Sequence, residues 1–292
     1  MLWQHIEQAI NATSSHHFIV KNHHTITGGS INKAYKISDG HQDFFVKTNH
    51  AHLVNMFAAE MAGLEEIRAS NTLYSPKPIT MGTSNNTAFL VLEYLNMEGH
   101  PIDDVQFGQQ LAAMHQRTNR HFGWHQNNTI GSTAQENNIS SNWIQFFQKH
   151  RLEYQFNLAA ANGFTGKLQN HGEKLMADLE LFFSNYHPKP SLVHGDLWSG
   201  NYGSLKKGRP VIFDPALYYG DRETDMAMTE LFGGFSKAFY AAYQEITPLD
   251  SGYQSRKTLY NLYHILNHLN LFGGSYLPQA EAMVNTLLAE IN

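Results

Sequence analysis

The pattern of apolar residues changes character near residue 95 of this chain. Before that point apolar and polar residues alternate as in strands, and the Asp39-Gly40 pair between two such runs predicts a hairpin. One helix is expected among these strands, over residues 51–70. The sequence therefore predicts an α+β protein with two lobes. The small β-rich lobe should span residues 1–95, and a larger helical lobe should span residues 96–292.

The spacing of apolar residues also predicts the individual elements. A buried strand is expected at residues 87–95. Besides 51–70, helices are expected at residues 2–10, 103–119, 143–162, 170–185, 222–245, 252–272 and 278–291. The segment 191–214 differs, because two short apolar runs, SLVHGD and PVIFD, flank the turn sequence KKGRP. A hairpin is therefore expected inside the helical lobe.

Composition excludes several classes of protein. The formal net charge of −5 offers no surplus of basic groups to neutralise nucleic-acid phosphates. Without cysteine, the chain has no disulfides, thiolate catalysis or cysteine-ligated zinc. No segment has the ~20 apolar residues of a membrane span, and the first residues do not resemble a signal peptide. We expect a soluble cytoplasmic protein, a monomer or weak dimer, that binds neither membranes nor nucleic acid.

The segment HGDLWSGN at residues 194–201 places Asp196 five residues before Asn201. Phosphoryl transfer from ATP needs a carboxylate near the attacking hydroxyl and oxygen ligands for Mg²⁺. The catalytic loop of protein kinases, H-R-D-x-x-x-x-N, has the same spacing. Asp214 ends the run PVIFD, and the expected hairpin would bring it to one metal cluster with Asn201. Either aspartate alone is as well explained by a turn, but the ordered set favours a kinase site.

The first lobe contains residue types that could bind the phosphates of ATP. Gly28-Gly29-Ser30 lies between two expected strands, where backbone N–H groups can cover phosphates, although such a pair often only makes a turn. Lys47 ends the strand FFVK, as the phosphate-binding lysine of kinases does. Glu60 falls on the apolar stripe of the following helix, and a carboxylate there needs a partner. We expect that partner to be Lys47, whereas Glu65 and Glu66 lie off the stripe.

The order of several motifs resembles the fructosamine kinase (ketosamine kinase) family, which belongs with the aminoglycoside phosphotransferases in the protein-kinase-like superfamily. These motifs are GGSIN, FFVK, VLEYL, FGWH, HGDLWSGN, IFDPA, ELFGGF and NHLNLFGG. The resemblance covers most of the chain and implies a protein-kinase-like fold. It also implies that ATP phosphorylates a sugar hydroxyl of a ketoamine, the rearranged product of glycation. The phosphate ester then breaks down and frees the amine, so the activity is deglycation.

The resemblance implies a role for each matching residue. Asp196 would be the catalytic base, and Asn201 and Asp214 would bind Mg²⁺. The ATP site would comprise the loop Gly28, Gly29 and Ser30, the Lys47–Glu60 pair, and a hinge whose backbone reads adenine, Glu93, Tyr94 and Leu95. Trp198 would lie beside the reacting sugar. Apart from the resemblance, Asp221, Glu223 and Asp225 open an expected helix and favour its N-terminus, and the alternative for Asp225 is that it ties down the catalytic loop.

The substrate class is predicted from residues 251–280, which contain no Asp or Glu. Aminoglycosides are polycations, so a site for them should offer several carboxylates. The uncharged polar residues of this helix suit a sugar instead, with His264 and Asn267 as the expected contacts. The alternative is a helix–helix contact lined with Asn and Tyr.

Two other functions stay open at this point. One is an aminoglycoside- or choline-type kinase, and the other is a pseudokinase that binds nucleotide without turnover. The 18 histidines do not indicate a metal centre, because adjacent pairs such as His16-His17 point to opposite sides of a strand.

Overall fold

The structure is a computed structural model that describes residues 2–14, 16–27, 31–97 and 100–291. The chain forms two compact units. The first consists of Met1–Asp103 together with Tyr202–Pro215, and the second of Asp104–Asn201 together with Ala216–Asn292. The first unit thus runs past the boundary expected at residue 95 and takes in a second, distant segment of the chain.

The first unit contains a five-stranded antiparallel sheet with the order β1-β2-β3-β5-β4. Its strands are β1 (Asn22–Ile26), β2 (Lys33–Ser38), β3 (Asp43–His50), β4 (Pro78–Ser84) and β5 (Thr87–Glu93). The predicted turn joins β2 to β3, where the Asp39 carboxylate accepts hydrogen bonds from the backbone N–H groups of His41 and Gln42. Gly40 adopts φ +91°, which glycine tolerates best.

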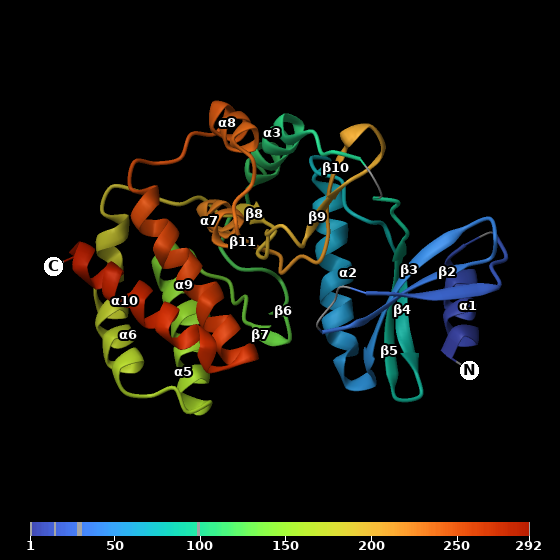
Figure 1. Cartoon of the computed structure of the whole chain (residues 1–292), viewed down its shortest axis with the longest axis horizontal. Coiled ribbons are helices and arrows are strands. Elements are labelled where there is room, and N and C mark those ends of the chain that lie inside the picture. Colours follow the sequence, from blue (N-terminus) through green and yellow to red (C-terminus); the bar gives the residue numbers. More distant parts are fainter. Residues whose placement is uncertain (1, 15, 28–30, 98–99, 292) are drawn as a thin grey trace. The chain divides into compact units, whose positions relative to one another are not determined.

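Two helices cover opposite faces of this sheet (Figure 1). They are α1 (Leu2–Thr13) and α2 (Val54–Ala69), and the 3₁₀ turn η1 (Ala51–Leu53) leads into α2. Because side chains alternate along a strand, Phe89 and Val91 of β5 pack toward α1, while Leu90 and Leu92 pack toward α2. Neighbouring positions of one strand therefore belong to two separate apolar clusters.

The second segment of the first unit is a short hairpin. It consists of β9 (Tyr202–Ser204), the turn η4 (Lys206–Gly208) and β10 (Pro210–Ile212). The backbone N–H of Ile212 donates to the carbonyl of Tyr74 at 3.0 Å, which joins the hairpin to the segment between α2 and β4. The hairpin therefore lies in the same unit as Lys47 and Glu60.

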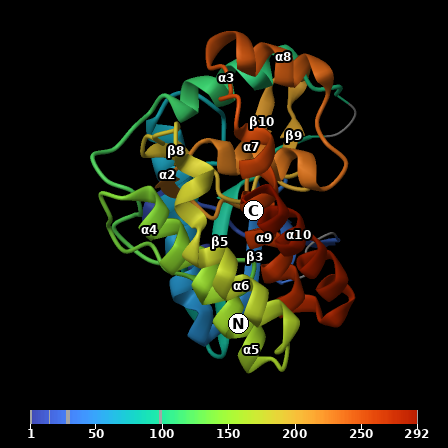
Figure 2. The same cartoon turned by 90° about the vertical axis from the view of Figure 1, so that its left-hand side faces the viewer.

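The second unit is mainly helical, and Figures 1 and 2 show α10 alongside α9. Its α-helices are α3 (Asp104–His115), α4 (Trp143–Phe147), α5 (Tyr154–Ala161), α6 (Lys167–Ala177), α7 (Glu223–Leu231), α8 (Lys237–Ile246), α9 (Tyr253–Phe272) and α10 (Leu277–Ile291). Shorter elements are the π-helix η2 (Gln148–Glu153), the 3₁₀ helices η3 (Leu179–Phe183) and η5 (Gly274–Tyr276), and the strands β6 (Asn128–Ile130), β7 (Thr133–Gln135), β8 (Ser191–Val193) and β11 (Tyr218–Gly220). None of the helices in the described parts of the chain has the length and apolar character needed to cross a membrane.

Several expected elements differ in detail. The helix expected at 143–162 contains the π-helix η2, and the helix expected at 222–245 is divided into α7 and α8 by Gly233 and Gly234, both with positive φ. The two apolar runs at 191–214 do not pair with each other. Instead β8 pairs with β11, and β10 pairs with β9. The expected hairpin exists, but its first strand is Tyr202–Ser204.

Candidate active site

Lys47, Glu60 and Asp214 form a charged cluster in the first unit. The Lys47 ammonium donates to Oε1 of Glu60 at 2.6 Å and to Oδ1 of Asp214 at 2.5 Å. Alternation along β3 turns Lys47 toward α2, where Phe57 and Leu64 of the predicted apolar stripe are fully buried. The expected pairing of Lys47 with Glu60 is therefore confirmed, and Glu65 is exposed.

The lysine stays charged although only 5% of it is exposed. Burial lowers the pKa of Lys47, but the nearby carboxylates of Asp214 and Glu60 outweigh this effect and raise the pKa above its ordinary value. A permanent cation held by two carboxylates is suited to contact the phosphates of a nucleotide.

Asp214 has an unusual backbone. Its φ is +58°, a left-handed conformation that residues with a side chain seldom adopt, and it precedes Pro215. Its side chain is 45% exposed even though one oxygen contacts Lys47. Residues in this region of backbone space are concentrated at functional sites. The conformation directs the carboxylate toward Lys47 and leaves part of it accessible.

The loop that the sequence predicts to be catalytic lies in the second unit and begins after β8. Gly195 has φ +83°, and a Cβ atom there would collide with the carbonyl of Ala216. The Asn201 side-chain amide donates to the Asp196 carbonyl at 2.8 Å and to its carboxylate at 3.0 Å. The side chain of Asn201 therefore closes the loop that begins at Asp196.

Asp225 of α7 anchors this loop from inside the unit. Its carboxylate accepts the backbone N–H groups of His194 at 2.7 Å and Gly195 at 2.8 Å, and lies 3.1 Å from Nε2 of His115. Burial raises the pKa of Asp225. Hydrogen bonds from His115 and the Gly195 N–H, together with the charges of His115 and His194, lower the pKa by more than burial raises it, so the net change is downward. The predicted role of Asp225 is confirmed by these contacts.

His115 was missed by the sequence reading. It ends α3, where its position after LAAM signals only a histidine on an apolar helix face. Its Nδ1 lies 2.7 Å from the Tyr243 hydroxyl, so its ring links α8 to the aspartate that holds the catalytic loop. The anchor of the loop is thus a buried polar network.

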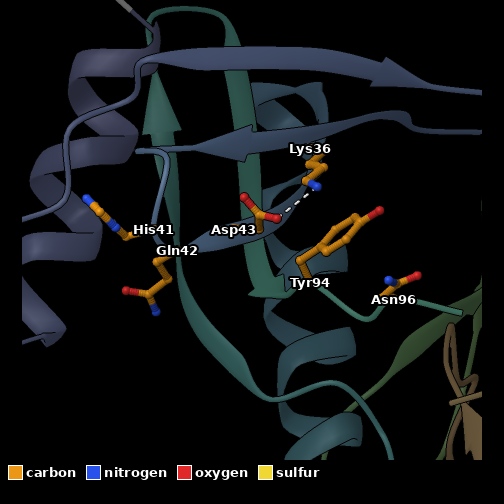
Figure 3. Close-up of a pocket in the computed structure, with 6 residues that line it drawn as sticks. All are labelled: Lys36, His41, Gln42, Asp43, Tyr94 and Asn96. Atoms are coloured by element: carbon orange, nitrogen blue, oxygen red, sulfur yellow. Dashed lines mark ion pairs between the residues drawn. The ribbon is translucent and has the colours of Figure 1, made fainter. Parts of the chain in front are cut away.

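The residues expected to form the hinge lie at the end of β5. The Glu93 carboxylate accepts from the Tyr74 hydroxyl at 2.6 Å and from the Lys77 N–H at 3.0 Å, so its side chain is engaged within the unit. Tyr94 borders a cavity of about 450 Å³, and the Lys36 ammonium lies 4.3 Å from the centre of its ring. Figure 3 shows Lys36 paired with Asp43 beside Tyr94. Gly28, Gly29 and Ser30 lie outside the described residues.

The expected substrate residues have different environments. Trp198 is half-buried, and its ring lies 6.0 Å from that of Phe232. His264 and Asn267 are only 4% and 3% exposed, so the expectation that α9 presents an open polar face is wrong. Asn267 bonds instead with Gln155 and with the carbonyl of Ile130. The helix is polar because it packs against polar partners.

These features define a class of protein. The first unit has an antiparallel sheet and a helix that together hold a Lys–Glu pair, and the second unit is helical and contains an Asp-x-x-x-x-Asn loop. This is the arrangement of a kinase-like phosphotransferase. The family model for fructosamine kinase matches residues 2–290, and the chain belongs to that family. It is therefore a phosphotransferase that acts on a sugar hydroxyl, and membership of a kinase family implies ATP as the donor.

Curated relatives resemble the chain over almost its full length. It is 47% identical over 288 residues to a "Probable ketoamine kinase" of Synechocystis, covering 98% of this chain and 97% of the relative. It is 38% identical to the chloroplastic protein-ribulosamine 3-kinase of Arabidopsis thaliana, covering 90% of this chain and 82% of the relative.

Solved structures share the fold. A candidate fructosamine-3-kinase of Haemophilus somnus superposes with a TM-score of 0.90 at 29% identity, covering 99% of this chain and 100% of the other. An ADP-bound aminoglycoside phosphotransferase has a TM-score of 0.62 at 12% identity, covering 98% of this chain and 96% of the other. The second comparison shows the fold alone.

Proposed function

We propose that the chain uses ATP to phosphorylate a sugar hydroxyl of ketoamines such as fructosyl- or ribulosyl-lysine, with Asp196 as the general base. The observation that carries this proposal is the hold on Asp196: Asn201 bonds its carboxylate, and Asp225 fixes the two preceding backbone N–H groups. A base must be held in one orientation to accept a proton as the reaction proceeds. The names of the Synechocystis and Arabidopsis relatives support the ketoamine as substrate.

In the proposed reaction the sugar hydroxyl gives its proton to the Asp196 carboxylate. A bond forms between the sugar oxygen and the γ-phosphorus of ATP, the bond from that phosphorus to the bridging oxygen breaks, and ADP leaves. The Lys47 ammonium contacts the nucleotide phosphates. The phosphate ester then breaks down and releases the amine, which is the deglycation that the family implies.

Mg²⁺ fits the residues assigned to it. Asn201 directs its amide N–H groups toward Asp196, so its side-chain oxygen is the atom that would ligate the ion, and the Asp214 carboxylate is partly exposed. Both are hard oxygen ligands of the kind that Mg²⁺ prefers. When bound, the ion neutralises charge on the phosphates.

The backbone of Glu93, Tyr94 and Leu95 is proposed to read the adenine edge, because the Glu93 side chain is already engaged. Trp198 is proposed to lie beside the sugar. A direct sugar contact is not proposed for His264 or Asn267, since both are buried.

A substrate panel tests the proposal. ADP release is measured with fructosyl-lysine, ribulosyl-lysine, kanamycin and choline, and with the Asp196→Asn variant as the inactive control. We expect ketoamines to give the highest kcat/KM, because the chain belongs to the fructosamine kinase family and resembles relatives named as ketoamine and ribulosamine kinases. Asp196→Asn should retain ATP affinity and lose about 10²–10⁴ in turnover. An aminoglycoside that outcompetes every ketoamine, or nucleotide binding without phosphate transfer, would contradict the proposal.

A further inference from the structure

The tripeptide Phe-Gly-Gly occurs at the ends of two different helices of the second unit. Phe232 follows α7 and Phe272 is the last residue of α9, and each precedes a glycine with positive φ, Gly233 at +101° and Gly273 at +92°. In both places the backbone turns away directly after the phenylalanine. Phe232 is 37% exposed and Phe272 is 53% exposed. The second unit therefore presents two aromatic rings at helix ends.

One histidine lies between these two rings. The His268 ring centre is 5.2 Å from that of Phe232, 5.4 Å from that of Phe272 and 5.2 Å from that of Tyr276. Phe232 in turn lies 6.0 Å from Trp198. These five residues, Trp198, Phe232, His268, Phe272 and Tyr276, form a continuous series of aromatic rings that we call the aromatic shelf.

The aromatic shelf begins at the catalytic loop. Trp198 is two residues after Asp196, and a Cβ atom at Gly200 would collide with its ring, so glycine there leaves room for the indole. In a ketoamine the nitrogen is only a few bonds from the hydroxyl groups of the sugar. When the sugar is bound at Asp196, the amine that carries it must therefore extend away from the sugar along a surface that adjoins Asp196. The shelf is such a surface within the second unit.

The shelf is aromatic and uncharged. Nδ1 of His268 lies 2.8 Å from the His264 carbonyl and donates to it, so Nε2 is the acceptor nitrogen of the neutral ring. Burial lowers the pKa of His268 and outweighs this hydrogen bond, which keeps the ring neutral at pH 7. Aromatic faces attract ammonium groups, and the same faces cover apolar chains.

The carboxylate of Glu230, which lies nearby in the chain, is not available to bind the ammonium of a ketoamine in place of the aromatic rings. Glu230, two residues before Phe232, accepts from the Tyr253 hydroxyl at 2.6 Å and from the Lys257 ammonium at 2.8 Å. Both of its oxygens are thus engaged by groups of the chain itself. An ammonium at the shelf would meet ring faces and the Nε2 acceptor.

We propose that the aromatic shelf binds the carrier side of the ketoamine, namely its secondary ammonium and the first carbons of the amine. Trp198 and Phe232 face the ammonium end, and Phe272 and Tyr276 contact the part of the carrier farther from the sugar. The proposal rests on the proposed function. It makes the amine, and not only the sugar, a determinant of which ketoamines are repaired.

The test uses ketoamines that share one sugar and differ in the amine: fructosyl-glycine, Nε-fructosyl-lysine and fructosyl-phenethylamine. The wild-type KM should fall as the carrier lengthens. Phe272→Ala should raise the KM for the two longer carriers about three- to tenfold, the range of one aromatic contact with a cation or chain. The KM for fructosyl-glycine, the KM for ATP and kcat should stay close to wild type. Phe272→Leu keeps apolar bulk at the helix end and should shift the same two KM values if the alanine variant is unstable.

Leu181→Ala is the matched control, because Leu181 is also 53% exposed in the second unit but lies outside the shelf. It should leave the whole series unchanged. The proposal is overturned if the wild-type KM does not depend on the carrier, or if both Phe272 variants change all three KM values equally or not at all. A wild-type enzyme that phosphorylates no ketoamine would instead contradict the proposed function, and this outcome is seen before any variant is made.

Discussion

The Asn201 side-chain amide donates two hydrogen bonds to Asp196, one to its backbone carbonyl at 2.8 Å and one to its carboxylate at 3.0 Å. Asn201 is only 7% exposed, so these bonds are shielded from water. One side chain thereby fixes the shape of the loop and the direction of the carboxylate.

Asn201→Ala removes both bonds and one proposed Mg²⁺ ligand. We expect kcat to fall about 10- to 100-fold, because two hydrogen bonds are lost and one of them goes to a charged carboxylate. The half-saturating Mg²⁺ concentration should also rise. Both are read from steady-state rates over a Mg²⁺ titration. A variant with normal kcat and an unchanged Mg²⁺ requirement would show that Asn201 has neither role.

Lys47→Met leaves Glu60 and Asp214 without their shared cation. We expect the KM for ATP to rise about tenfold and kcat to fall, because a charge-assisted contact to phosphate is lost. Glu60→Gln should give a weaker change in the same direction, since Asp214 still contacts the lysine. Glu65→Gln is the control on the exposed side of α2 and should behave as wild type. If Glu65→Gln mimicked Lys47→Met and Glu60→Gln did not, the assignment of the pair would be wrong.

Asp225→Asn tests the anchor beneath the loop. The aspartate accepts two backbone N–H groups with its two oxygens, whereas an asparagine has one oxygen and would turn its own N–H₂ toward the other N–H. We expect kcat to fall about 10²-fold with little change in the KM for ATP, and the melting temperature to fall as well. Stopped-time assays and thermal unfolding measure both. If the variant had a lower melting temperature but the wild-type kcat, Asp225 would contribute to stability alone and not to catalysis.

The buried His264 makes stability depend on pH. Burial lowers the pKa of His264 to about 3, so the folded protein keeps the ring neutral while the unfolded chain binds a proton below about 6.5. Its contribution is fully present above pH ~6.5 and is lost as pH falls toward 3, by at most about 1.4 kcal/mol per pH unit.

Urea unfolding at pH 7.5 and pH 5.0 measures this loss. The free energy of unfolding should fall less between the two pH values in His264→Gln than in wild type. His187→Gln, at an exposed position, should keep the wild-type difference. Equal pH differences in wild type and His264→Gln would refute the assignment.

The sequence predicted the sheet and helix of residues 1–95 and the Lys47–Glu60 pair, because periodicity is a reliable guide there, but it predicted neither the addition of residues 202–215 to this unit nor the contact of Lys47 with Asp214. Lys47 could be paired with Glu60 from the apolar stripe of α2, since the neighbouring positions of that stripe are buried. The spacing of HGDLWSGN, together with the family resemblance, supplied the proposed roles of Asp196 and Asn201. The hold of Asp225 on the loop was only the second of two expectations for this residue, and its partner His115 lies far away in the chain.

The burial of α9 could not be predicted in the same way. Its Tyr, His and Asn residues look like a solvated or ligand-facing surface, because a periodic pattern equates polar with exposed. In the structure Tyr260 donates to Asp221 and Tyr263 donates to Gln135. These partners are remote in sequence, so only the tertiary structure reveals that the polar groups are satisfied internally. Three-residue strands such as β8 and β11 were missed or mispaired because so short a segment has no period.

The division of the first unit between two chain segments sets an order of assembly during synthesis. Lys47 and Glu60 leave the ribosome with Met1–Asp103, but Asp214 and the strand that reaches Tyr74 belong to Tyr202–Pro215. At a translation rate of ~5–20 residues per second, about 5–20 seconds pass between the two segments. Until that segment is synthesised, Lys47 has Glu60 but not Asp214 as a carboxylate partner. The first unit can therefore be completed only after residues 104–201 of the second unit have been synthesised.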